Sequence, residues 1–124
     1  MFKGVTDWFK GLQSKKASVE EVHDLLQSAT KEQFAFVDVR RGDEWNTGYI
    51  EGFRHIPLVD LGLHASQLSS YEKIYFICRS GSRSEAACTI MKNIGYENAY
   101  SVSGGILAWH KKGYPMIRQI ASKD

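Results

Sequence analysis

One segment constrains the fold more than any other: an apolar run, a short turn that opens on a cysteine, and a helical pattern. Lys73–Ile77 is rich in Tyr, Phe and Ile, which predicts a strand inside a sheet covered on both faces. Over 84–94 apolar residues recur on one face at helical spacing, at Ala87, Ile90, Met91 and Ile94. We therefore expect a strand–turn–helix unit with Cys78 at the carboxyl end of the strand.

The turn itself favours an anion at its centre. Its backbone N–H groups can curl toward the Cys78 sulfur, and the N-terminus of the next helix lies below. Such surroundings favour thiolate over thiol, so Cys78 is the candidate nucleophile. We expect Cys78 to be the one exposed, reactive thiol of the chain. A cysteine that merely packs in the core is the alternative for this residue type, but the glycine and two arginines at this spacing favour reactivity. The candidate anion-binding loop comprises Arg79, Ser80, Gly81, Ser82, Arg83 and Ser84.

Composition limits the classes of protein that remain. The 124 residues are 43% hydrophobic and 24% charged, which is typical of one globular domain. A net charge of +2 is too small to indicate nucleic-acid binding. We expect no membrane-spanning helix, because no apolar run reaches about 18 residues. Cys78 and Cys88 lie in neither a metal-binding nor a disulfide pattern, so we expect no metal, no cofactor and a reducing, cytoplasmic location. Cys88 is interpreted as a core residue.

Strands and helices alternate along the chain, which predicts an α/β fold. We expect a central, mostly parallel sheet of about five strands with helices on both faces. Ser18 and Glu21 form a capping-box pattern that opens the first helix of the domain. The strand over 34–40 ends in Asp38 and Arg40, which places this pair near the rim of a site at the strand ends, although a structural ion pair is the favoured interpretation. The expected division is 1–16 for an N-terminal segment, 17–116 for the domain and 117–124 for a polar tail.

The N-terminal segment is amphipathic. Its large apolar residues Phe2, Val5, Phe9 and Leu12 share one helical face. Basic residues lie on the opposite face. A helix packed on its own domain or on a second copy is the first interpretation, and weak association with a membrane surface or a partner through residues 2–12 is the other. Residues 13–16 are polar and are predicted to form a linker.

Four blocks together resemble the rhodanese-like sulfurtransferases, single-domain members above all, over about 18–115. They are Val37-Asp38-Val39-Arg40, then Glu44-Trp45 with Gly48-Tyr49-Ile50-Glu51-Gly52 and Ile56-Pro57, then the Cys78 loop, and last Gly104-Gly105 with Trp109 and Gly113-Tyr114-Pro115. Tyr49, Phe53 and His55 depart from the residues that are common in the family, at positions of packing and loops.

The resemblance implies a rhodanese-like fold and a thiosulfate sulfurtransferase reaction. Cys78 would take the outer sulfur of a small donor such as thiosulfate, form a persulfide and pass the sulfur to cyanide or a thiol. The loop amides would hold the transferred sulfur, and Arg79 and Arg83 could hold the sulfonate end of the donor. Whether Arg79 is catalytic or only electrostatic stays open.

Two other functions remain open. A persulfide carrier would exchange sulfur with a donor or acceptor protein, or act as a partner-binding module, with little turnover of free substrates. A phosphatase or arsenate reductase is disfavoured, because four residues separate Cys78 from Arg83 where the phosphatase loop has five. The shorter loop suits one sulfur atom better than a tetrahedral phosphate.

Overall fold

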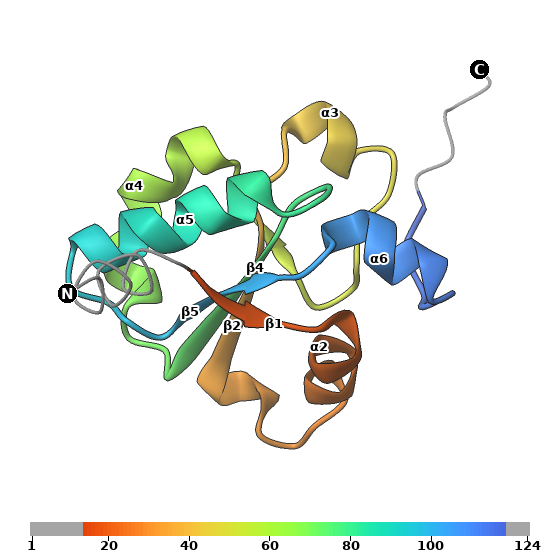
Figure 1. Ribbon diagram of the computed structural model, residues 1–124, viewed down its shortest axis with the longest axis horizontal. Coiled ribbons are helices and arrows are strands. Elements are labelled where there is room, and N and C mark those ends of the chain that lie inside the picture. Colours follow the sequence, from red (N-terminus) through yellow and green to blue (C-terminus); the bar gives the residue numbers. More distant parts are fainter. Residues whose placement is uncertain (1–13, 119–124) are drawn as a thin grey trace, which may run out of the picture.

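A parallel five-stranded sheet organises the chain in a computed structural model that describes residues 14–118 (Figure 1). Its strand order is β1-β5-β4-β2-β3, and every pairing of strands is parallel. The strands are β1 Lys15–Ala17, β2 Phe34–Asp38, β3 Arg54–His55, β4 Lys73–Ile77 and β5 Ala99–Val102. The helices are α2 Val19–Leu26, α3 Gly42–Trp45, α4 Leu61–Leu68, α5 Ser82–Asn93 and α6 Gly105–Lys111, with short 3-10 turns at Lys31–Gln33 and Leu58–Asp60. The predicted α/β fold is confirmed; the predicted amphipathic segment over 2–12 lies outside the described residues.

The sheet separates two apolar cores. Along β4, Ile74 and Phe76 face the core beneath α4 and α5, whereas Tyr75 and Ile77 face the core beneath α2 and α6. All four side chains are at most 1% exposed. Because successive strand residues point to opposite faces, a central strand with helices on both sides must be apolar throughout, which explains its unbroken run.

The first helix begins where the sequence predicts. Ser18 is the N-cap of α2, and its hydroxyl accepts a hydrogen bond from the Glu21 amide at 3.0 Å. This bond satisfies one of the amides that lack a partner at a helix start. It also fixes the point at which the chain leaves β1.

The predicted linker over 13–16 is wrong for its second half. Lys15 and Lys16 belong to β1, which pairs with β5 at the edge of the sheet. Their side chains are exposed, as an edge strand permits, so the hydrophobic pattern carries no sign of a strand. At the other end, Ile117 forms an antiparallel bridge with Tyr49, so the folded part extends into the predicted tail.

Candidate functional site

The sulfur of Cys78 lies at the carboxyl end of β4, directly above the first turn of α5. It accepts hydrogen bonds from the Gly81 amide at 3.0 Å and the Ser84 amide at 3.3 Å. Gly81 has a φ of +130°, a conformation open to glycine at little cost, and it turns the chain into α5. Two amides and the start of a 12-residue helix therefore converge on one sulfur atom, an arrangement that stabilises negative charge there.

Cys78 is not the exposed thiol that the sequence analysis expected. The residue is 1% exposed, because α5, the loop and neighbouring strands surround it. Arg79, Ser80 and Ser82 are the exposed residues of the loop, whereas Gly81 and Ser84 are buried. The loop thus covers the sulfur with its own backbone and meets solvent through its outer residues.

Helix α6 supports the loop from behind. Its Ile106 amide donates to the Cys78 carbonyl at 2.9 Å, and its Leu107 amide donates to the Arg79 carbonyl at 3.1 Å. This approach needs glycine at position 105, where φ is +57° and a Cβ would collide with those same two carbonyl oxygens. The Gly104-Gly105 pair in the sequence is thus explained by a contact between two backbones.

Arg83 is held by an ion pair that the sequence analysis missed. Its guanidinium donates to both carboxylate oxygens of Glu44, at 2.6 and 2.9 Å. Hydrogen bonding from Arg83 is the main cause that lowers the pKa of Glu44 to about 2, and the same bonds raise the pKa of Arg83. The pair joins α3 to the first turn of α5, so Arg83 is engaged with protein rather than directed freely into the site.

Arg79 has the opposite environment. It is exposed, and within residues 14–118 the structure records no side-chain partner for it. Of the two loop arginines, Arg79 is therefore the one available to an anion that approaches from solvent.

Asp38 and Arg40 form the structural ion pair that the sequence favoured rather than an open rim. They are 0% and 5% exposed, and the Arg40 guanidinium donates to both Asp38 oxygens at 2.9–3.0 Å. Arg40 also donates to the carbonyls of Glu44 and Gly48, at 3.4 and 2.7 Å. The pair therefore anchors α3, which in turn places Glu44 beside Arg83.

Cys88 lies on α5, about one helical turn after Ser84, and its side chain is buried in the core. Burial raises the pKa of its thiol to about 12, which keeps it protonated near neutral pH. This agrees with the prediction of a core cysteine and leaves Cys78 as the candidate nucleophile.

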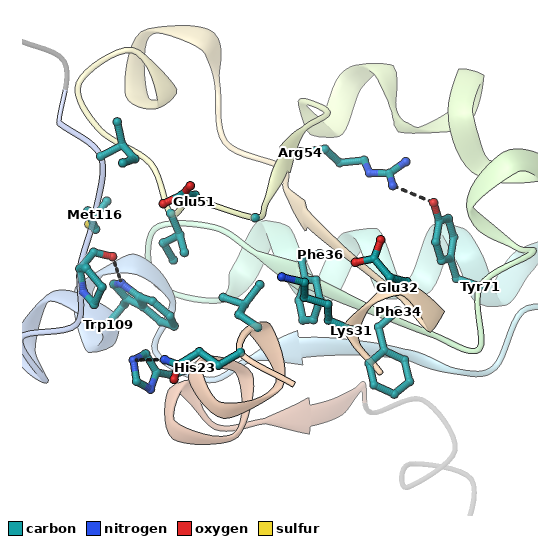
Figure 2. A pocket seen from close by; sticks show the side chains of 16 residues that line it. His23, Lys31, Glu32, Phe34, Phe36, Glu51, Arg54, Tyr71, Trp109 and Met116 are labelled. Atoms are coloured by element: carbon teal, nitrogen blue, oxygen red, sulfur yellow. Dashed lines mark hydrogen bonds between the residues drawn. The ribbon is translucent and has the colours of Figure 1, made fainter. Parts of the chain in front are cut away.

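The structure also has a groove away from the Cys78 loop. Figure 2 shows it between α2 and the segment that leads into β3. The volume of the groove is about 460 Å³. Aromatic side chains, among them Phe34, Phe36 and Trp109, line it together with charged residues such as Lys31 and Arg54. No residue of the Cys78 loop lines this groove, so it is separate from the candidate active site.

Comparison with known proteins identifies the family. A family model described as a rhodanese-like domain matches residues 18–112. The chain belongs to the rhodanese-like family. Among the solved structures, a rhodanese-like domain protein from Staphylococcus aureus is 27% identical and superposes with a TM-score of 0.71, over 86% of this chain and 99% of that one. The parallel sheet with helices on both faces is thus the rhodanese-like fold.

Several relatives have names that describe sulfur chemistry. "Thiosulfate sulfurtransferase GlpE" of Shewanella oneidensis is 28% identical over 90 residues, which are 73% of this chain and 89% of that protein. "Putative sulfur carrier protein YrkF" of Bacillus subtilis is 37% identical over 81 residues, 65% of this chain. This rhodanese-like chain spans only 44% of the length of the Bacillus protein. Within the described residues, no helix has the length and apolarity needed to span a membrane.

Proposed function

We propose that the protein is a sulfurtransferase that moves a sulfane sulfur from thiosulfate to a thiophilic acceptor through a persulfide on Cys78. The observation that carries this proposal is the cradle around Cys78 Sγ, with two amides at 3.0 and 3.3 Å at the start of α5. The name of the Shewanella relative supports thiosulfate as the donor.

The reaction has two displacements. Cys78 thiolate attacks the outer sulfur of thiosulfate, a new S–S bond forms, and the bond to the sulfonate sulfur breaks. Sulfite leaves with the electron pair of that bond, and the outer sulfur keeps its own negative charge as the terminal sulfur of the persulfide. Cyanide then attacks this terminal sulfur, which yields thiocyanate and restores Cys78 thiolate. Neither step consumes a proton, so no general base is required, and ping-pong kinetics are expected.

Groups of the loop can stabilise the negative charge at both ends of thiosulfate, the outer sulfur and the sulfonate. Amides of the segment 79–84 would hold the terminal sulfur of the persulfide, because a preorganised dipole costs no rearrangement during the reaction. Arg79 would attract the sulfonate, since Glu44 already occupies the guanidinium of Arg83.

A persulfide carrier is the second candidate function. Cys78 is only 1% exposed, and the Bacillus relative is named for sulfur carriage. A carrier would exchange sulfur with a protein that opens or reaches the loop, and would turn over free thiosulfate slowly. In a cell, the acceptor would then be a protein or small thiol rather than cyanide.

Parallel assays separate these functions. The expected result is transfer from thiosulfate to cyanide, measured as thiocyanate, that is lost in Cys78→Ser. Slow turnover with thiosulfate beside fast uptake from a protein persulfide would favour the carrier. Hydrolysis of a phosphate ester with no sulfur transfer would contradict both and indicate a phosphatase.

A further inference from the structure

We propose that Ser101, which lies outside the loop, is a positioning residue that sets the direction of the Ser84 hydroxyl and thereby strengthens Cys78 as a nucleophile. The proposal rests on the proposed role of Cys78 and adds a residue to the same site. Ser101 lies on β5 beneath α5 and is 1% exposed, while Ser84 is 0% exposed. Their hydroxyl oxygens are 2.6 Å apart.

The contacts of Ser84 decide which hydroxyl donates. Ser84 Oγ lies 2.9 Å from the Gly81 carbonyl, which can only accept, so Ser84 uses its single hydrogen there. Ser101 must then donate to Ser84. Within the described residues, Ser101 Oγ makes no other hydrogen bond, so its proton has one acceptor. The order of donation therefore runs from Ser101 to Ser84 to the loop.

The Cys78 sulfur also contacts the Ser84 hydroxyl, so it belongs to the same chain of hydrogen bonds. Cys78 Sγ lies 3.6 Å from Ser84 Oγ, a distance at which the thiol donates to the hydroxyl. When the sulfur carries a negative charge it becomes an acceptor, and the Ser84 hydrogen can turn toward it. The Gly81 carbonyl tolerates this turn, because the Glu85 amide also donates to it at 3.0 Å.

Ser101 is what makes this turn favourable. Its donated hydrogen bond occupies a lone pair of Ser84 Oγ in both states, so the Ser84 hydrogen points toward the loop rather than back to the sheet. A hydroxyl that accepts a hydrogen bond is also a better donor, and a buried chain of such bonds is stronger than one in water. Ser101 would therefore add to the negative-charge stabilisation that the Gly81 and Ser84 amides provide.

Alkylation of Cys78 by iodoacetamide tests this role without any sulfur donor. Ser101→Ala should slow the reaction near neutral pH by about 2- to 10-fold, the effect of one buried hydrogen bond. The slowing should shrink as the pH rises and vanish once the thiol is ionised in both proteins, since thiolate is the reacting species. A loop that was merely loosened would change the rate equally at every pH.

Cys88→Ala is the matched control, because it removes one buried heavy atom from α5 itself, and within the described residues Cys88 shares no hydrogen bond with Ser84 or Ser101. It should alkylate like the parent protein. Ser101→Ala should also have no further effect when Ser84 is already alanine, since Ser101 acts through Ser84. Should Ser101→Ala not fold, Ser101→Thr and Ser101→Val form a second pair of equal shape, of which only the threonine should retain the fast rate.

Equal alkylation rates for Ser101→Ala and Cys88→Ala would overturn the proposal. The proposal would also fail if Ser101→Ala slowed alkylation by the same factor in a protein that already carries Ser84→Ala. In the second pair, a folded threonine variant as slow as the valine variant would likewise overturn it. These results would leave sulfur transfer by Cys78 intact. Conversely, a parent protein that accepts no sulfur would refute the transfer reaction without affecting the alkylation series.

Discussion

The Arg83–Glu44 ion pair should stabilise the protein in a manner that depends on pH, and Glu44→Gln tests it. The side chains are 28% and 16% exposed and share two hydrogen bonds. Lowering the Glu44 pKa from 4.5 to about 2 corresponds to roughly 3 kcal/mol, at about 1.36 kcal/mol for each pH unit. Because water still reaches the pair, we expect the substitution to reduce the free energy of unfolding by about 1–3 kcal/mol at pH 7.

The sign of the pH dependence follows from the direction of the shift. A carboxylate whose pKa is lowered by folding stabilises the native state fully above its unfolded pKa of 4.5 and loses that contribution as the pH falls through about 2. The difference between the parent protein and Glu44→Gln should therefore shrink as the pH is lowered through this window. Urea unfolding at a series of pH values measures it, with slopes compared to confirm that the unfolded states match.

Glu97→Gln is the control, because it removes an exposed carboxylate of the same type. It should change stability little at any pH. If Glu44→Gln were as stable as the parent at pH 7, or if its deficit persisted unchanged at the acidic end of the window, the assignment of this pair as a stabilising contact would fail.

Three further predictions concern the loop and the helices next to it. Cys88→Ser should retain most of the sulfur transfer, because its buried thiol has a pKa of about 12; a loss equal to that of Cys78→Ser in a folded protein would show that Cys88 takes part. Gly105→Ala should reduce stability by about 1–3 kcal/mol, because alanine disfavours a φ of +57° and collides with the Cys78 and Arg79 carbonyls; a thermal melt at the parent temperature would contradict that account. Arg79→Ala should raise KM for thiosulfate with little change in stability, and more so at low salt; an unchanged KM would remove Arg79 from donor binding.

The local parts of the site could be predicted from the sequence. The Cys78 loop, its strand and its helix are contiguous, so their order and spacing carry the information directly. Gly104-Gly105 was found for a related reason, since a glycine pair between a strand and a helix indicates close backbone approach. The unbroken apolar run of β4 likewise indicated a strand covered on both faces.

The parts that were missed depend on tertiary contact. Glu44 belongs to one of the blocks that carry the resemblance, but it lies 39 residues from Arg83, and nothing in the sequence pairs the two side chains. Ser101 resembles a polar interruption in a strand until its neighbour Ser84 is known. Burial of Cys78 follows from the way α5 and α6 enclose the loop, and β1 is too short and too polar to be recognised by periodicity.

Intact-mass spectrometry after incubation with thiosulfate tests the central claim most directly. We expect a mass increase of one sulfur atom, located on the peptide that contains Cys78 and removed by cyanide. No gain in mass, or a sulfur that appears equally on Cys78→Ser, would contradict it.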